Sequence, residues 1–231
     1  MALDLNATGK GATTVSGRRD NHSVGSLLAI AVEVFNVRGY DGTSMEDLAR
    51  AAGITKSSIY HHVSGKEELL RLAVSRALDG LFASLEEPGA TQGTATDRLE
   101  YVIRRTCLEL VGNLPYVTLL LRVRGNTAAE REALERRRDF DHRMAALVEA
   151  AVAEGGLRPG LDPRLTARLV FGMVNSVTEW FRPQASGSTG SNGTGSNGTA
   201  EQAGAGAGMT GPAIAEAVTA LVFDGLRADG H

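Results

Sequence analysis

The fold is decided by residues 43–69, which read T-S-M-E-D-L-A-R-A-A-G-I-T-K-S-S-I-Y-H-H-V-S-G-K-E-E-L. This stretch predicts two short helices joined by a tight turn and then the start of a third. Thr43 and Glu46 are expected to form a capping box, in which each side chain satisfies a free backbone amide of the other. Gly53 is expected to end the first helix, because glycine readily takes the left-handed conformation of a C-terminal cap.

The second of these helices is predicted to be polar over most of its surface. Thr55 is expected to cap it, and only Ile59 and Val63 form an apolar seam along it. Such a helix buries little, so its polar face is free to meet a ligand. Helix, turn and polar second helix is the helix-turn-helix plan, whose second helix lies in the major groove of DNA. Ser64 and Glu67 are expected to form a second capping box and to begin the next helix.

These residues resemble the N-terminal domain of the tetracycline-repressor (TetR) family of bacterial regulators. The resemblance is close over residues 24–72 and is one of helix layout beyond them. The matching features are Gly39-Tyr40, Thr43, Ala52-Gly53-Ile54, the Ile59-Tyr60-x-His62 core and Gly65-Lys66-Glu67-Glu68-Leu69.

DNA-contacting residues are expected at the start of the recognition helix, where short hydroxyl side chains suit phosphates and base edges. Lys56 is expected to reach a guanine edge. The resemblance implies phosphate contacts for Tyr60, His62, Thr43 and Lys66, and base or sugar contacts for the more variable position of His61. The candidates are Thr43, Thr55, Lys56, Ser57, Ser58, Tyr60, His61, His62 and Lys66. Adjacent histidines point to different sides of a helix, so no metal site is expected.

Charge limits how this region binds DNA. The chain has a formal net charge of −3, and residues 17–70 contain six basic and seven acidic residues. A broad basic patch is therefore absent, and binding must depend on a few local contacts doubled by dimer symmetry. Weak non-specific binding and a modest dependence on salt are expected. Residues 1–22 are predicted to be a disordered arm. Its Arg18 and Arg19 are interpreted either as part of a slack tail or as minor-groove contacts.

The remaining apolar periodicity predicts an all-α fold of about nine helices. Residues 23–70 are predicted to be the DNA-binding domain and residues 71–231 a ligand-binding and dimerisation domain. The latter contains a flexible Gly/Ser-rich insert at 184–210. Residues 88–95 are expected to be a loop. Helices are expected at 23–38, 66–86, 96–112, 115–124, 127–154, 162–182 and 211–227.

The helix expected at 162–182 is apolar on more than one side and must therefore bury more than one side. The family resemblance implies a homodimer joined through the helices at 162–182 and 211–227 of each chain. It also implies a repressor that binds a palindromic operator in double-stranded DNA and is released by a small-molecule effector.

An effector pocket is expected within the second domain, since bundle interiors are common ligand sites. Each candidate residue named below could instead have only a structural role, as part of the core or, for Arg122, as a surface charge. Two short stretches, L-R-V-R-G-N-T and W-F-R-P, are similar to a TetR subgroup that senses acyl-CoA thioesters. The candidate lining residues are Phe82, Ile103, Cys107, Tyr116, Leu120, Arg122, Met144, Phe171, Asn175 and Trp180.

Other functions are less compatible with the sequence. It contains no phosphate loop, no metal-ligand spacing and no nucleophile elbow, so neither an enzyme nor a cofactor is expected. The one cysteine cannot form an internal disulfide, and no signal-like or membrane-spanning run is present, which favours the cytoplasm. An alternative is a helix-turn-helix protein whose C-terminal domain only dimerises or docks a protein partner.

Overall fold

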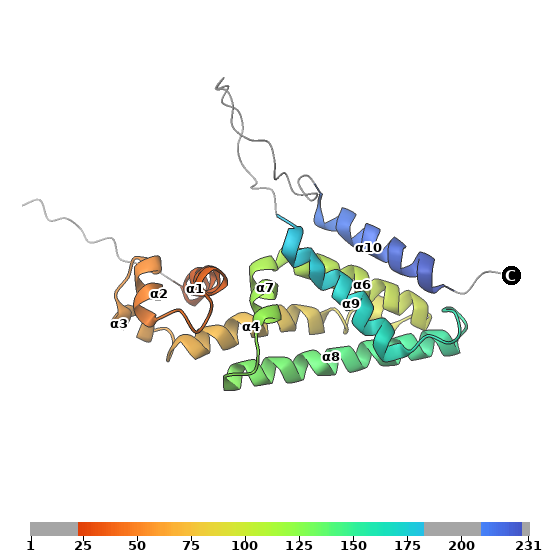
Figure 1. Cartoon of the computed structure of the whole chain (residues 1–231), viewed down its shortest axis with the longest axis horizontal. Helices are drawn as coiled ribbons and strands as arrows, with labels where there is room; N and C mark the ends of the chain where they lie inside the picture. The colour runs from red at the N-terminus through yellow and green to blue at the C-terminus, as the bar shows by residue number, and fades with distance from the viewer. Residues whose placement is uncertain (1–22, 183–208, 228–231) are drawn as a thin grey trace, which may run out of the picture.

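The structure is a computed structural model that describes residues 23–182 and 209–227. All elements of these residues are helices, and they form an elongated molecule with the three N-terminal helices at one end (Figure 1). The predicted all-α class is confirmed. The expected arm at 1–22 and most of the expected insert at 184–210 lie outside the described residues. Within the described ranges, no helix is both long and apolar enough to cross a bilayer.

The N-terminal helices α1 (Val24–Arg38), α2 (Met45–Ala52) and α3 (Lys56–Tyr60) pack around a small core. One large side chain from each helix lies at its centre: Phe35, Leu48 and Ile59 are at most 1% exposed. Gly53 ends α2 with φ of 68°, a left-handed conformation that other residues rarely adopt. The turn between α2 and α3 therefore forms where the sequence places it.

The capping box of α2 lies one residue later than expected. Ser44 and Asp47 form it: the Ser44 hydroxyl accepts a hydrogen bond from the Asp47 amide, and the Asp47 carboxylate accepts one from the Ser44 amide. Hydrogen bonds from Ser44 lower the pKa of Asp47 to about 2. The pairing of Thr43 with Glu46 was wrong, because Thr43 is buried and donates its hydroxyl to the Gly39 carbonyl at 2.7 Å.

The second expected capping box, between Ser64 and Glu67, was also wrong. The Ser64 side chain donates to the Glu68 carboxylate at 2.6 Å, one residue beyond the expected partner. Gly65 is the N-cap residue of the next helix and offers no side chain for a cap. At α3 the expectation was right, since the Thr55 hydroxyl accepts a hydrogen bond from the Ser58 amide at 3.2 Å.

A long helix, α4 (Lys66–Ala83), leads from the N-terminal helices into the second domain. The expected loop at 88–95 contains one helical turn, α5 (Pro88–Thr91), because Pro88 is favourable at the first helical position. The described residues therefore form ten helices, one more than expected. The others are α6 (Ala95–Gly112), α7 (Leu114–Arg122), α8 (Ala128–Ala153), α9 (Pro163–Trp180) and α10 (Gly211–Leu226).

Helix α7 joins the two ends of the molecule. Its buried residues Tyr116, Leu119 and Leu120 belong to the same apolar cluster as the N-terminal helices. Two hydrogen bonds fix it to α1: the Asn36 amide donates to the Pro115 carbonyl at 2.8 Å, and Arg122 donates to the Asn36 carbonyl at 2.6 Å. Helix α7 therefore bridges the N-terminal helices and the rest of the molecule.

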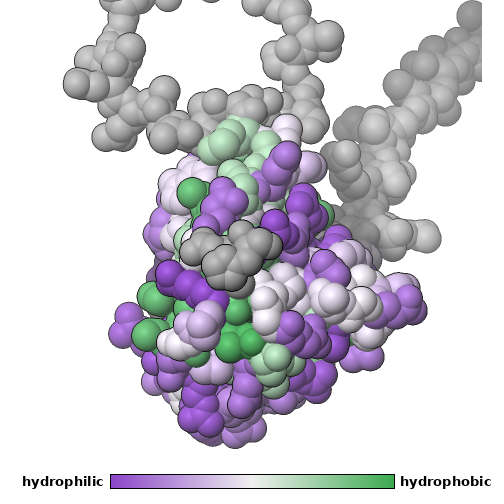
Figure 2. All heavy atoms as spheres, turned by 90° about the vertical axis from the view of Figure 1, so that its right-hand side faces the viewer, coloured by the Kyte–Doolittle hydropathy of each residue, from purple (hydrophilic) through white to green (hydrophobic). Residues whose placement is uncertain are grey.

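The larger core lies among α6, α8, α9 and α10, with α10 packed mainly on α6. Seen from the end of the molecule opposite the N-terminal helices, the surface is largely hydrophilic, with hydrophobic residues gathered in small groups (Figure 2). Helix α9 departs from this pattern. Its exposed large apolar residues follow one stripe at intervals of four and seven: Leu165, Leu169, Met173 and Trp180.

Candidate nucleic-acid interface and ligand cavity

The recognition helix α3 is held by one buried residue and leaves its other side chains accessible. Ile59 is fully buried, whereas Tyr60 is 48% exposed. The Thr55 hydroxyl lies within hydrogen-bond distance of the hydroxyls of Ser57 and Ser58, at 3.0 and 2.9 Å. These hydroxyls face water at the start of the helix, where they can exchange these bonds for bonds to DNA.

His61 and His62 lie just beyond the last residue of α3, and both are exposed. The helix is thus shorter than its apolar seam indicated, because the chain turns after Tyr60 and buries Val63 from that turn. Both imidazoles remain on the surface next to Tyr60 in sequence.

Three of the expected DNA-contacting residues border one shallow hollow: Thr43, Tyr60 and Lys66 line it together with other residues of the loop before α2, Met45 and Gly65. Two of these three side chains, those of Thr43 and Lys66, donate hydrogen bonds to backbone carbonyls of the protein. The Lys66 amine donates to the carbonyls of Tyr40 and Thr43 at 3.0 and 3.1 Å, and it lies 4.4 Å from the centre of the Tyr40 ring.

The Thr43 and Lys66 side chains are therefore both engaged within the protein, and phosphate contact stays a prediction for both. The Thr43 hydroxyl is buried, and Lys66 locks the loop before α2 onto α4. Of the three expected contact residues in this hollow, Tyr60 is the one whose side chain remains exposed. The sequence did not distinguish these roles, because the hydrogen bonds that occupy Lys66 join residues 23 and 26 positions apart.

The other basic side chains of the described helix-turn-helix region are also engaged. Arg38 and Arg50 both pair with Asp47, at 2.9 and 3.2 Å, and Lys56 donates to Glu46. The bond to Glu46 raises the pKa of Lys56 and lowers the pKa of Glu46. The Lys56 amine is therefore engaged with Glu46 in this structure, and its contact with DNA stays a prediction.

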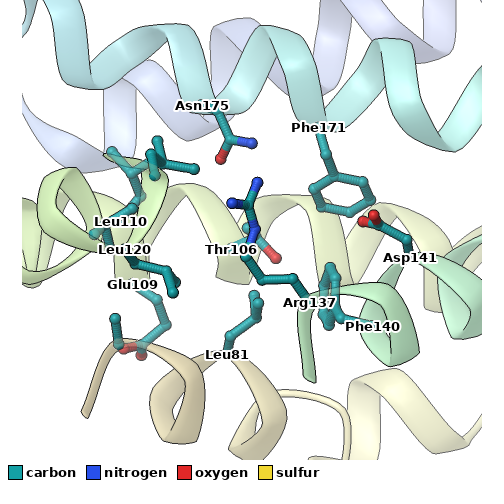
Figure 3. Close-up of a pocket in the computed structure, with 13 residues that line it drawn as sticks. Leu81, Thr106, Glu109, Leu110, Leu120, Arg137, Phe140, Asp141, Phe171 and Asn175 are labelled. Carbon is teal, nitrogen blue, oxygen red and sulfur yellow. The ribbon is translucent and has the colours of Figure 1, made fainter. Parts of the chain in front are cut away.

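A cavity lies in the second domain, enclosed by α4, α6, α7, α8 and α9 (Figure 3). It holds about 590 Å³ of atom-free space, including its opening to solvent. Most of its wall is aliphatic or aromatic, which suits an apolar ligand group. The lining residues are Ala77, Leu81, Thr106, Glu109, Leu110, Val117, Leu120, Leu121, Arg137, Phe140, Asp141, Phe171 and Asn175.

Three of the expected pocket residues are in this wall: Leu120, Phe171 and Asn175. Seven lie elsewhere, because side chains with the right periodicity also fill the solid core. Ile103 and Cys107 are almost fully buried in that core, and burial raises the pKa of the Cys107 thiol to about 11, which keeps it protonated.

The remaining five each have another setting. Tyr116 lies under the Arg76 guanidinium, 4.6 Å from its ring centre, and Arg122 is bound to α1. Trp180 is on the exposed stripe of α9. Phe82 packs edge-on against Phe140 with ring centres 6.1 Å apart, and Met144 borders a separate hollow with Leu85 and Arg143.

Sequence reasoning included Asn175 but missed the other polar residues of the cavity, which are Thr106, Glu109, Arg137 and Asp141. Arg137 lies in a charged run of the sequence and Asp141 just beyond it, yet both are spaced with Phe140 and Met144 at three- and four-residue intervals. That spacing was the available signal. Partial burial raises the pKa of Asp141, while Arg137, Arg168 and His142 act in the opposite direction.

Family models match most of the described chain. Residues 27–73 match the model for bacterial regulatory proteins of the tetR family, and residues 92–189 match the tetracyclin repressor-like C-terminal domain. The first match covers the helix-turn-helix and the second covers most of the cavity wall.

Three similar proteins place these matches in context. A crystal structure of a TetR transcriptional regulator family member from Streptomyces coelicolor A3 is 56% identical, with a TM-score of 0.75 over 91% of this chain and 94% of that one. The transcriptional repressor KstR2 of Rhodococcus jostii is 29% identical over 74% of this chain and 83% of its own length. AibR, solved with isovaleryl coenzyme A and operator DNA, shares the fold at 23% identity, with a TM-score of 0.66 over 87% and 97%.

Proposed function

Because this chain belongs to the TetR family of bacterial transcriptional regulators, we propose that it represses transcription from an operator and is released by a small effector. The observation that carries the proposal is the pairing of an exposed polar recognition helix with a largely apolar cavity in one chain. A protein that acts on DNA in this way works in the cytoplasm and needs no catalytic group.

DNA binding is proposed to centre on Thr55, Ser57, Ser58 and Tyr60, whose side chains are accessible at α3. His61 and His62 extend this surface beyond the helix, and Lys56 joins it after leaving Glu46. Thr43 and Lys66 are proposed to act by holding the loop before α2, and through backbone amides rather than free side chains.

The operator is proposed to be palindromic. The exposed stripe of α9 indicates a symmetric dimer, and the two recognition helices of such a dimer would bind two half-sites related by the same symmetry. Leu165, Leu169 and Met173 are 40% to 64% exposed, and Leu221 of α10 is 69% exposed. Isolated exposed leucines are ordinary, but a continuous apolar stripe on one helix marks a protein interface. A second copy placed here would form a four-helix bundle from two α9 and two α10 helices.

The effector is proposed to be an acyl-CoA thioester. The cavity offers a largely aliphatic and aromatic wall, which suits the chemistry of an acyl chain, and it opens to solvent, where a larger polar head can remain. AibR, which has the same fold, was captured with such a thioester and with its operator.

Release is proposed to follow linkage between the two sites. An effector that binds better to the DNA-incompetent arrangement weakens operator binding by that difference in affinity. Two routes lead from the cavity to DNA. Helix α4 contributes Ala77 and Leu81 to the wall, and α7 contributes Leu120 while its ends bind Asn36.

A gel-shift assay on the gene's own upstream DNA tests the proposal, with isovaleryl-, octanoyl- and palmitoyl-CoA added in turn. We expect sharp retardation that one thioester releases. Retardation that no thioester releases would reject the effector class and leave the DNA-binding role. Failure to retard both this DNA and any sequence selected from a random pool would reject the repressor.

A further inference from the structure

The cavity contains a guanidinium without a partner. Arg137 of α8 is half-buried, and neither a hydrogen bond nor an ion pair joins it to another described residue. Elsewhere in the described ranges arginines that approach the interior have partners, as Arg105 does with Glu87 and Glu109 at 3.0 Å. A charged group that is partly withdrawn from water without a partner is costly, so an unpaired arginine here indicates a missing ligand group.

Two further polar groups flank this guanidinium. The Thr106 hydroxyl of α6 is buried and has no hydrogen-bond partner among the described residues. The Asn175 side chain descends from α9, and Figure 3 shows Arg137 reaching between Thr106 and Asn175. Unsatisfied buried hydroxyls are rare in native proteins and call for an explanation.

The chemistry of these three groups defines what would satisfy them. A guanidinium only donates hydrogen bonds, and a hydroxyl and an amide can both donate as well. Their common partner is an oxygen acceptor, and a negatively charged one gives the strongest bonds to arginine. The surrounding wall of Leu81, Leu110, Phe140 and Phe171 offers no competing acceptor.

Two carboxylates in the wall do not take this role. Glu109 already binds Arg105 and the Asn113 amide. Asp141, one turn further along α8, interacts with Arg137 electrostatically, but no hydrogen bond or ion pair joins the two, and the Arg137 side chain points away from it (Figure 3). Arg137 and Thr106 therefore have no hydrogen-bond acceptor among the described residues of this wall.

We propose that the effector carries an oxygen acceptor, a carboxylate or a ketone, on the part of the molecule that enters the cavity, and that Arg137, Thr106 and Asn175 bind this oxygen. This deepens the proposed function: among acyl-CoA thioesters, the protein selects oxygenated acyl chains over plain hydrocarbon chains. The selectivity follows because a plain chain would leave all three donors desolvated and unpaired.

Isothermal titration calorimetry of the full-length protein tests the selection with thioesters matched in length. The probes are butanoyl-, succinyl- and acetoacetyl-CoA, and octanoyl-, octanedioyl- and 3-oxooctanoyl-CoA. We expect at least one oxygenated thioester to bind about tenfold or more tightly than the plain thioester of equal length. Equal affinity for plain and oxygenated partners in both sets would overturn the proposal.

Matched variants connect the preference to these residues. Arg137→Met and Thr106→Val are expected to abolish it, while Arg138→Met, on the next, exposed residue, keeps it. Thr106→Val should not lower Tm, because it removes an unsatisfied hydroxyl. Thr219→Val is the control that should lower Tm, since the Thr219 hydroxyl donates to the Ala215 carbonyl at 2.6 Å. A preference that survives Arg137→Met would overturn the assignment.

Free octanoate separates this inference from the proposed effector class. If no thioester binds but octanoate binds and loses affinity in Arg137→Met, the oxygen site stands and the coenzyme A class is wrong. If neither the thioesters nor octanoate bind to the wild type, both are overturned. If thioesters bind without any dependence on Arg137 or Thr106, the effector class stands and the oxygen site is wrong.

Discussion

Helices α3 and α9 both leave a face uncovered, but the two faces differ in chemistry. Helix α3 buries Ile59 and exposes hydroxyls and Tyr60, whereas α9 buries one apolar face and exposes a second, which includes Leu165 and Leu169. A polar exposed face on a short helix can be solvated, so its cost in the free protein is small. An apolar exposed stripe is costly in water and is relieved only by another protein surface. The first is suited to DNA and the second to a second copy of the chain.

The largest expected effect comes from charging the stripe of α9. Leu169→Glu would bury an unpaired carboxylate in the proposed dimer, so we expect the dimer dissociation constant to rise about hundredfold or more. Light scattering after size exclusion measures this, and operator binding should be lost together with the dimer. Val37→Glu is the control, because Val37 is 82% exposed on α1, away from α9. An unchanged dimer in Leu169→Glu would place the interface elsewhere.

Substitutions at two adjacent residues of α3 distinguish a role in stabilising the fold from a role in contacting DNA. Ile59→Ala removes a fully buried side chain and should destabilise the N-terminal helices by about 2–5 kcal/mol. Tyr60→Ala should change the free energy of unfolding by only about 0.5 kcal/mol, yet weaken operator binding about tenfold or more. Thermal unfolding and fluorescence anisotropy with labelled operator measure the two effects. Unfolding of Tyr60→Ala would show that this residue supports the fold rather than contacting DNA.

The cap of α2 should have an intermediate effect that is confined to the DNA-binding end. Ser44→Ala should cost about 1 kcal/mol, with little change in the dimer, and exposed Ser57→Ala serves as control. The pKa of Asp47 lies at about 2 in the folded protein, below its ordinary 3.8. The contribution of its ionised form is therefore complete above about pH 4 and is lost as the pH falls towards 2.

Stability measured across that range should show the difference between wild type and Ser44→Ala shrinking as the pH falls. A difference that instead stays constant from pH 6 to pH 2 would mean that the carboxylate of Asp47 is not part of the cap.

The smallest effect is expected from the internal partner of Lys56. Glu46→Gln frees the amine for DNA, and because exposed ion pairs are weak, operator affinity should rise only about two- to fivefold. Lys56→Gln should reduce the slope of log affinity against log salt by about one. Glu33→Gln changes charge equally on α1 and is the control. Equal gains in Glu46→Gln and Glu33→Gln would indicate net charge rather than release of Lys56.

The sequence alone determined most of the helical layout and the family. Apolar residues at helical spacing and cap residues such as Thr55, Gly53 and Asp162 are local signals, because each acts within one turn of its own helix. Helix α10 was expected from its apolar period and is present at Gly211–Leu226. The capping boxes were misplaced by a single residue, since neighbouring serine, threonine and acidic residues offer equally good local partners.

Only the tertiary structure decided which side chains remain free to act. Lys66 resembles a phosphate anchor in the sequence, but its amine is bound by carbonyls from the loop before α2. Cys107 and Phe171 each lie on the apolar face of their own helix, yet Cys107 fills the core and Phe171 lines the cavity. Arg137 belongs to a charged run and faces inward. A cavity forms where the side chains of helices distant in sequence do not fill the space between those helices. The apolar periodicity of one helix carries no information about how far away its neighbours pack.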